Sequence, residues 1–460
     1  MKSQMERTSS KEYTATKNAC KLCAPLGASL VFKGIAGAVP LLHGSQGCST
    51  YIRRYLISHY REPIDIACSN FAEETAIFGG GANLKIALQN IHRQYSPSLV
   101  GIATTCLSET IGDDVPMFIR EYAASHPDES IAPLVHVSTP SYQGTHMQGF
   151  HNAVLATVKT LAVTGKFSNI GHVNIFPGMV SPADLRYLKE ILIDFNLPFM
   201  MLPDYSRTLD GSLWPEYQLI PEGGTTVEMI RCSASAAGSL EFGRILSREK
   251  QSAGKWLQEK YGVDCRHLGL PVGITETDRF FQALEVLSGR PTPEKYQEER
   301  GRLIDSYVDS HKHVMSAKVA VYGEEDLVVA MTTFFSEIGI LPVICASGDR
   351  SGYLKEELAR VFPDDLDQSI RVMDNADFVD IESAVQDAKP DLIVGNSKGY
   401  AMSRSLGIPM VRIGFPIHDR VDASRRLHLG YRGTQQLFDR IANKLIEYRQ
   451  LSSTVGYTYM

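Results

Sequence analysis

The sequence has no apolar run that approaches the ~20 residues of a membrane-spanning helix. Its first 16 residues are polar and mixed in charge, without the apolar region of a secretory signal peptide. It also lacks an excess of positive charge, because 46 Lys and Arg residues stand against 52 Asp and Glu residues, a net charge of −6. We therefore expect residues 1–16 to form a flexible arm of a cytoplasmic protein that binds neither membranes nor nucleic acid.

Complete glycine motifs for nucleotide binding are absent as well. Gly79-Gly80-Gly81 lacks the GK[ST] ending of a phosphate-binding P-loop. Tyr322-Gly323 lacks the further glycines of a dinucleotide fingerprint, and the acidic residues that follow it would repel a pyrophosphate. We therefore predict no nucleotide site in this chain.

A second CxxC pair is missing, so Cys20 and Cys23 do not predict a structural zinc site by themselves. Eight cysteines in a long intracellular chain favour metal ligation or free thiols over disulfides. Free cysteine is often simply buried. We assign that packing role to Cys68, Cys232, Cys265 and Cys345.

Three other cysteines lie at or near predicted turns and helix starts, which are common ligand-binding positions in α/β proteins. Residues 98–103 are an apolar run that predicts a buried strand, and Cys106 follows it at a strand-to-helix turn. Cys48 closes a glycine-rich turn before a predicted helix, whose N-terminus would stabilise a thiolate. Cys23 precedes the Pro25-Leu26-Gly27 turn. From the residues alone, an iron–sulfur cluster and inert packing both stay open.

The order of predicted elements gives the fold class. Strands are predicted at 99–103, 133–138, 172–177, 199–203, 318–323, 341–344, 391–395 and 410–414. They alternate with helical stretches, which predicts an α/β protein with three Rossmann-like, doubly wound domains and parallel sheets. We place these domains at 17–165, which carries Cys23, Cys48 and Cys106, at 166–292 and at 318–460. A helical connection at 293–317 joins the last two.

Several longer motifs carry a resemblance to a known family. They are CAPLGA at 23–28, HGSQGC at 43–48, TTCLSETIGDD at 104–114, TPSYQG at 139–144, PEGGT at 221–225, GNSKG at 395–399 and RIGFP at 412–416. With them the chain resembles the β-type chains of the nitrogenase component 1 family. That resemblance implies the component 1 fold over nearly the whole chain.

The resemblance also implies a cofactor and partners. Cys23, Cys48 and Cys106 match the ligands of one half of a P-cluster-type iron–sulfur cluster, 8Fe-7S or 4Fe-4S, shared with the α subunit of an α2β2 heterotetramer. Ser141 matches a serine that can ligate the oxidised cluster, although it could merely shape its turn. Phe78 matches a phenylalanine that contacts the ATP-dependent iron–sulfur reductase, the alternative being a core side chain.

Two functions follow from the family. The first is a β-type electron-relay subunit of a nitrogenase-like reductase, acting on dinitrogen or another small molecule such as a methylthio-alkane. Leu246 stands where the α subunit has its cofactor cysteine, so we expect no substrate site in this chain. The second is the N-type subunit of the cofactor-assembly scaffold, in which many chains keep only the cysteine matching Cys48.

Side chains next to the cysteines have two possible roles. Glu109, Asp113 and Asp114 could orient the cluster loop or favour the start of a helix. Tyr51 and Arg53 could line the cluster pocket or pack along their helix. We leave both pairs of roles open.

Overall fold

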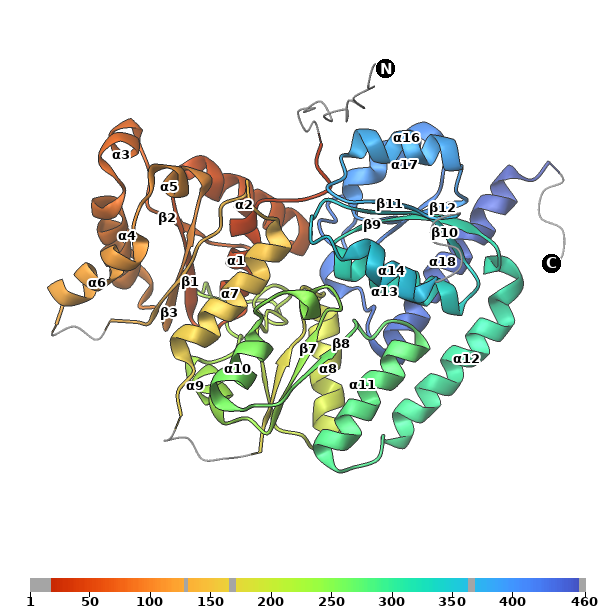
Figure 1. The fold of residues 1–460 in the computed structure, drawn as a ribbon, viewed down its shortest axis with the longest axis horizontal. Coiled ribbons are helices and arrows are strands. Elements are labelled where there is room, and N and C mark those ends of the chain that lie inside the picture. Colours follow the sequence, from red (N-terminus) through yellow and green to blue (C-terminus); the bar gives the residue numbers. More distant parts are fainter. Residues whose placement is uncertain (1–17, 128–130, 165–170, 363–368, 455–460) are drawn as a thin grey trace, which may run out of the picture.

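The computed structural model describes residues 18–127, 131–164, 171–362 and 369–454. The predicted arm at 1–16 lies outside these ranges. The described chain forms three sheets, each with helices around it, and every strand pair in them is parallel (Figure 1). This confirms the predicted fold class of three parallel α/β units.

The first sheet has the strand order β2-β1-β3-β4. Its two central strands are buried at every position, which explains their almost wholly apolar sequences. The strands are β1 (Ala38–His43), β2 (Ala67–Cys68), β3 (Leu99–Thr104) and β4 (Leu134–Val137). The helices are α1 (Ala24–Lys33), α2 (Gln46–Tyr60), α3 (Glu73–Phe78), α4 (Gly81–Tyr95), α5 (Cys106–Ile111), α6 (Val115–Ser125) and α7 (His146–Leu161).

The second sheet has the order β6-β5-β7-β8. The predicted helix at 247–261 begins later than expected, because Ser252 caps it by accepting a hydrogen bond from the Lys255 backbone. The strands are β5 (Val173–Phe176), β6 (Phe199–Met201), β7 (Gly238–Phe242) and β8 (Cys265–Leu268). The helices are α8 (Pro182–Asp194), α9 (Val227–Arg231), η1 (Cys232–Ser235), η2 (Leu246–Arg248), α10 (Ala253–Tyr261) and α11 (Gly273–Ser288).

The third sheet has the order β11-β10-β9-β12-β13. Its strands are β9 (Lys318–Gly323), β10 (Leu341–Ser347), β11 (Arg371–Met373), β12 (Leu392–Gly395) and β13 (Met410–Arg412). Its helices are α13 (Glu325–Glu337), α14 (Leu354–Val361), α16 (Phe378–Ala388), η3 (Ser397–Gly399), α17 (Tyr400–Leu406) and η4 (Ala423–Arg425).

Two long helices tie the units together. The helical connection is α12 (Glu294–Val314), and the C-terminal helix α18 (Gly430–Ser452) packs along it and against α11. At the other end of the chain, Ala19 bridges Asp377, so residues 18–20 lie against the third unit before the chain enters the first. Among the described residues, no helix is both long and apolar enough to cross a membrane.

Helices α1 and α7 cross at unusually close range because a glycine lies on each side of the contact. A Cβ on Gly27 would lie 1.7 Å from the His146 carbonyl oxygen, and one on Gly149 would lie 1.9 Å from the Ala24 carbonyl oxygen. Only glycine allows backbones to approach so closely. The crossing fixes the start of α1 against the start of α7, and the site described next is built there.

Candidate functional site

Cys23, Cys48 and Cys106 all lie at helix starts. Cys106 is the first residue of α5, directly after β3, and Cys48 is in the first turn of α2, after β1. Since β1 and β3 are neighbouring parallel strands, the two thiols lie at the same carboxyl edge of the sheet. Cys23 is the N-cap of α1, so the Pro25 segment is the first turn of that helix. Cys106 thus lies at the strand-to-helix turn that the sequence predicts, whereas Cys48 lies within the first turn of its helix and not before it.

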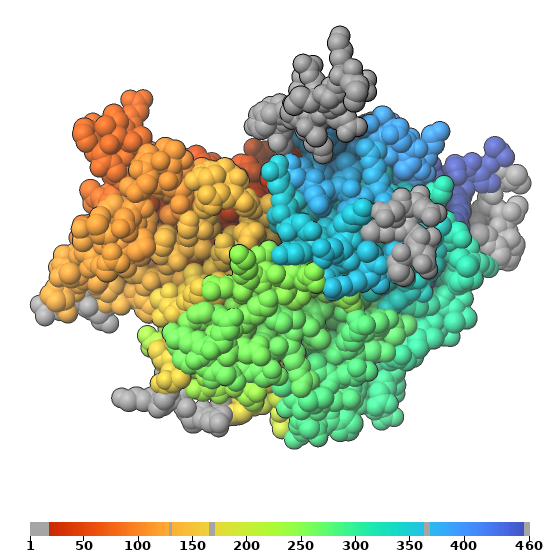
Figure 2. All heavy atoms as spheres, in the orientation of Figure 1, coloured from red at the N-terminus to blue at the C-terminus, as the bar shows by residue number. Residues whose placement is uncertain are grey.

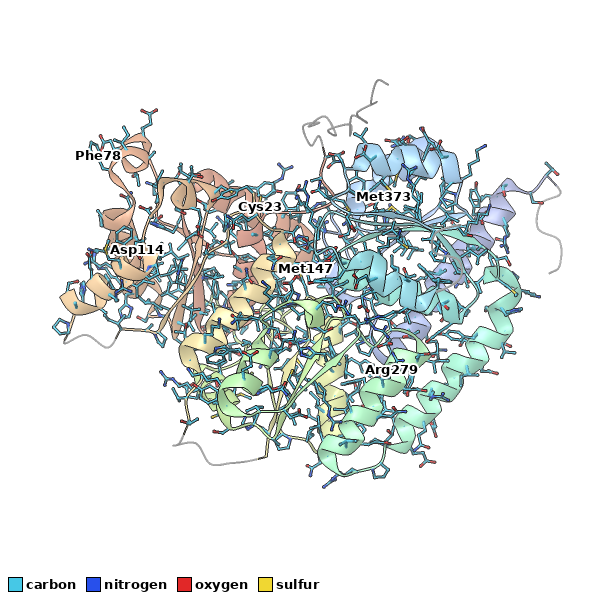
Figure 3. The ribbon with its side chains drawn as sticks, viewed as in Figure 1. Cys23, Phe78, Asp114, Met147, Arg279 and Met373 are labelled. Carbon is cyan, nitrogen blue, oxygen red and sulfur yellow. The ribbon has the colours of Figure 1, made fainter. Side chains whose placement is uncertain are left out.

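Backbone hydrogen bonds to His146 hold the segment before Cys23. The His146 N–H donates to the Leu22 carbonyl at 3.0 Å, and its Nδ1 accepts from the Leu22 N–H at 3.3 Å. The other ring nitrogen lies 3.0 Å from Oε1 of Glu324, in the third unit. Cys23 therefore lies where the first and third units meet (Figure 3).

The three thiols are close enough to influence one another electrostatically. Burial raises the pKa of Cys23, a hydrogen bond with Ser141 lowers it, and the charges of Cys106 and Cys48 raise it further. The three sulfur atoms do not, however, all lie within 4.8 Å of one another. One tetrahedral ion would need sulfur atoms about 3.8 Å apart, given metal–sulfur bonds of about 2.3 Å. The three thiols are therefore not arranged around a single tetrahedral ion.

Ser141 lies between two of the thiols. Its Oγ accepts a hydrogen bond from the Ala24 N–H at 3.1 Å, and its own N–H donates to Sγ of Cys106 at 3.3 Å. The hydroxyl is also hydrogen-bonded to Cys23. The serine thus lies beside the thiols, and it also shapes its turn.

The acidic residues after Cys106 divide between the two predicted roles. Asp114 caps α6 by accepting from the Met117 N–H at 2.9 Å, which is a helix-start role. Glu109 instead accepts from Thr104 and, at 2.6 Å, from Ser138, so it joins the end of β3 to the loop that carries Ser141.

Asp113 is a second loop-fixing acid. One oxygen lies 3.0 Å from Nε2 of His43, at the end of β1, and the other accepts from the Gly80 N–H at 3.0 Å. It therefore joins three loops at the carboxyl edge of the first sheet. Glu109 and Asp113 therefore connect the loops around the thiols.

Tyr51 and Arg53 also have different roles. Burial raises the pKa of Tyr51 and the nearby charge of Cys23 adds to this increase, which places the phenol beside the site. The Arg53 side chain donates from Nε to the Ile64 carbonyl at 2.8 Å and lies 3.6 Å from Asp65. Arg53 therefore anchors a neighbouring loop.

Two further neighbours of the thiols are Lys398, which was not assigned from the sequence, and Cys68, which was assigned a packing role. Lys398, in the GNSKG motif, donates from Nζ to the Ala19 carbonyl, and its charge acts on both Cys20 and Cys23. Burial raises the pKa of Cys68, and the charge of Cys48 adds a smaller increase. The GNSKG motif was the one sequence signal that marked Lys398. The sequence does not show that this lysine of the third unit lies near Cys23, because only the tertiary fold brings the two together.

The remaining cysteine assignments can be compared with the structure. Cys20 is buried against Ala376 and the third sheet, and burial raises the pKa of its thiol to about 12. Cys345 is fully buried in β10, as the packing role predicts. Cys265 is only half-buried and lies beside Glu241 and His267.

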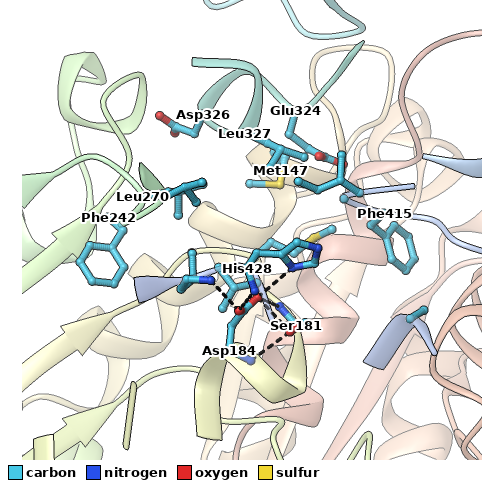
Figure 4. A pocket seen from close by; sticks show the side chains of 18 of the residues that line it. Met147, Ser181, Asp184, Phe242, Leu270, Glu324, Asp326, Leu327, Phe415 and His428 are labelled. Atoms are coloured by element: carbon cyan, nitrogen blue, oxygen red, sulfur yellow. Dashed lines mark hydrogen bonds and ion pairs between the residues drawn. The ribbon is translucent and has the colours of Figure 1, made fainter. Parts of the chain in front are cut away.

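A mainly apolar cavity of about 70 Å³ lies between the three units (Figure 4). Asp184 lies on its wall and accepts hydrogen bonds from Ser181 and from the backbone of His428. No cysteine is among the described residues that line the cavity. Leu246 is buried nearby, and its N–H lies 3.3 Å from Asp326, on the cavity wall.

Phe78 is not a core side chain. It ends the short helix α3 and is 85% exposed, and Ile77 beside it is also exposed. The α3 segment projects from the body of the molecule at the upper left of the space-filling view (Figure 2), and Phe78 lies near its tip (Figure 3). The exposed position excludes the core alternative.

Comparisons with known proteins agree with this architecture. A family model described as nitrogenase component 1 type oxidoreductase matches residues 23–446. A nitrogenase molybdenum–iron protein beta chain from Clostridium pasteurianum is 35% identical, with 94% of this chain and 93% of the relative covered. A nitrogenase iron–molybdenum cofactor biosynthesis protein NifN from Bradyrhizobium diazoefficiens is 32% identical, with 95% and 92% covered.

A solved structure gives the same result in three dimensions. A chain of nitrogenase Cp1 at pH 6.5 superposes with a TM-score of 0.93 and 33% identity, over 98% of both chains. The match of family, relatives and structure extends across all three units and the thiol site. The chain therefore belongs to the nitrogenase component 1 type oxidoreductase family, as a β-type chain.

Proposed function

We propose that this chain is the β-type subunit of a nitrogenase-like reductase and relays electrons through an iron–sulfur cluster held by Cys23, Cys48 and Cys106. The observation that carries the proposal is the meeting of three thiols, from three helix starts, at one partly exposed edge. When bound there, such a cluster accepts and releases single electrons. The substrate of the complex would be dinitrogen or another small molecule such as a methylthio-alkane.

The residues present fit such a cluster. Thiolates are its usual ligands, and Lys398 supplies a positive charge near Cys23 that offsets part of the negative charge of the site. The Ser141 hydroxyl lies within hydrogen-bonding distance of the same loops and could serve as a further oxygen ligand. Glu109 and Asp113 hold in place the loops around the thiols.

Three thiolates do not complete a four-ligand cluster, which implies a partner chain. Cys106 is exposed and Cys23 and Cys48 are half-buried, so the site has an open side that another subunit can cover. We propose that an α-type subunit supplies the remaining ligands there, in an α2β2 heterotetramer. The cluster would then be P-cluster-type, 8Fe-7S or 4Fe-4S, and lie at the subunit boundary.

The exposed α3 segment supports docking of an ATP-dependent iron–sulfur reductase near Phe78. An exposed phenylalanine beside an exposed isoleucine leaves apolar surface in contact with water. Association with a partner would bury this surface, which is favourable. Electrons would enter from this partner, and this chain would bind no nucleotide.

The size and lining of the cavity between the units support the proposal that this chain holds no substrate cofactor of its own. At about 70 Å³ it is smaller than the roughly 150 Å³ cavity that holds benzene in a well-studied case. Its described lining has no thiol, and Leu246 cannot ligate iron.

The scaffold function remains the second candidate, because the NifN relative is almost as similar as the nitrogenase beta chains. The retention of all three thiols favours the relay. The two functions differ in their product, since a relay complex turns over a small molecule, whereas a scaffold delivers a matured cofactor.

An anaerobic assay separates the two. The purified complex is given its reductase, ATP and a low-potential donor, and a cofactor-free acceptor enzyme is present in a parallel reaction. We expect many turnovers of proton or acetylene reduction and no activation of the acceptor. Activation of the acceptor with only trace turnover would assign the scaffold function instead.

A further inference from the structure

A second group of metal-ligating side chains lies in the second unit, apart from the three thiols. It consists of Glu241 on β7 and of Cys265 and His267 on β8. Glu241 and His267 are direct partners in the register of these parallel strands. Since side chains alternate along a strand, Cys265 and His267 project from the same face of β8.

The distances suit one small cation. The ligand atoms of the three side chains all lie within 4.8 Å of one another. Nδ1 of His267 is 3.3 Å from Oε2 of Glu241, yet the two atoms form no hydrogen bond. A nitrogen and an oxygen bound to the same tetrahedral zinc ion, at about 2.0–2.2 Å each, would lie about 3.4 Å apart. A histidine nitrogen and a carboxylate oxygen therefore already have the separation of two zinc ligands.

Helix α10 begins against this group and leaves room for it. A Cβ on Gly254 would lie 2.2 Å from Sγ of Cys265 and 3.1 Å from Oε2 of Glu241, so the absence of a side chain at Gly254 makes space for both atoms. The Gly254 N–H donates to Oε1 of Glu241 at 3.2 Å, and the Ser252 hydroxyl donates to Oε2. These donors orient the carboxylate as the supporting partners of metal ligands do.

The charges of the group are not balanced within the chain. Lys255 is near, but its Nζ donates to the carbonyls of Ser247 and Glu249 at 2.8 and 2.6 Å. A divalent ion would balance one thiolate and one carboxylate, with the thiol proton of Cys265 released on binding.

We propose that Glu241, Cys265 and His267 bind a zinc ion that joins the edge strand β8 to β7 and the start of α10. Sulfur, imidazole and carboxylate are the ligand types that zinc takes, whereas magnesium and calcium require oxygen ligands. Cys265 and His267 are half-buried, so water can occupy a fourth position. The site is structural and independent of the proposed electron relay.

Zinc retention by the full-length chain in its complex tests the proposal. The complex is treated with a chelator, incubated with Zn²⁺ alone, desalted and analysed for zinc by mass spectrometry. We expect about one zinc per chain in the wild type and almost none in Cys265→Ala or His267→Gln. Cys232→Ala is the matched control, because Cys232 is also a half-buried cysteine in the second unit, and it should retain zinc.

X-ray absorption at the zinc edge identifies the site without a variant. The wild type should show one sulfur neighbour and the remainder nitrogen or oxygen. Two or more sulfur neighbours would place the zinc at the thiol site instead. That result would overturn the proposal, as would equal zinc retention by all variants or no retention by the wild type.

Discussion

Cys23 owes its position to residues far along the chain. His146 in α7 holds the backbone before it, Ser141 is hydrogen-bonded to its thiol, and Lys398 from the third unit places a positive charge nearby. None of these contacts can be read from the local CxxC pattern. The pattern instead groups Cys23 with Cys20, which the structure buries against a different sheet.

The ligand assignment predicts a selective loss of iron. Cys48→Ala should lower the iron content of the anaerobically purified complex and weaken its association with the α partner, because one metal then lacks its thiolate. Cys345→Ala, which changes a fully buried cysteine in β10, should do neither. Iron analysis, the cluster spectrum and co-elution of the subunits provide the measurement. Full iron and an unchanged spectrum in Cys48→Ala would show that Cys48 is not a ligand.

His59 predicts a specific dependence of stability on pH. Burial, with nearby positive charges, lowers its pKa from 6.5 to about 3, so the folded chain keeps it neutral while the unfolded chain protonates it below pH 6.5. The unfolded state then binds more protons, and stability falls as the pH drops from about 6.5 towards 3. At about 1.4 kcal/mol per pH unit, the loss between pH 6.5 and 5 is about 2 kcal/mol.

The matched variant is His59→Gln, whose side-chain oxygen can still accept from the Ile417 N–H as Nδ1 of His59 does at 2.8 Å. Denaturant unfolding at pH 7 and pH 5 should show a loss of stability about 2 kcal/mol larger in the wild type than in the variant. Equal pH dependence in the two proteins would mean that His59 is protonated in the folded state as well.

At the scale of elements, the strands with continuous apolar sequences were predictable and the others were not. Runs such as those of β3, β5 and β9 were located from the sequence because both faces of these strands are buried. In contrast, β7 contains a buried glutamate and β8 reads Cys-Arg-His-Leu, so neither has the apolar pattern of a buried strand. Their polar residues form the proposed zinc site, a pairing that only the sheet register reveals.

Strand β1 was missed for a different reason. Pro40 lies in its middle, and proline is normally excluded from central strands. The neighbouring strand β2 has only two residues and pairs with Leu41 and Leu42, so Pro40 lies outside that pairing. The strand is therefore compatible with proline, although its sequence argues against it.

The projecting helix α3 predicts a docking defect without loss of stability. Phe78→Ala should slow reductase-dependent electron delivery, while the free energy of unfolding changes by less than about 0.5 kcal/mol, because the ring is 85% exposed. Ile193→Ala is the control, since Ile193 is 65% exposed on α8, in another unit. Stopped-flow reduction and thermal unfolding measure the two effects. A large drop in thermal stability, or equal electron delivery by both variants, would contradict this role.

The crossing of α1 and α7 predicts a stability effect. Gly27→Ala forces a Cβ into the His146 backbone and should cost about 1–3 kcal/mol of stability, with reduced iron content because Cys23 lies at the start of α1. Gly301→Ala in the exposed face of α12 meets no neighbouring atom and should instead stabilise by about 1 kcal/mol. Denaturant unfolding of both variants checks the opposite signs. Equal effects would show that the crossing tolerates a methyl group.

At the scale of the whole molecule, the thiol site is assembled by the arrangement of the units. The first unit supplies all three thiols, the third supplies Lys398 and Glu324, and the site remains open where a partner can cover it. The motifs of the sequence identify the family and the three cysteines. They do not identify Lys398 and Glu324 as supporting residues, because these two come from another unit and act only through the tertiary fold.

The most direct test of the account is the location of iron in a crystal of the anaerobically purified complex. Diffraction data collected above and below the iron absorption edge locate iron independently of the protein atoms. We predict iron bonded to the sulfur atoms of Cys23, Cys48 and Cys106, in one cluster that also contacts the α partner. Absence of iron there, or iron at Cys48 alone, would contradict a shared cluster held by three thiols of this chain.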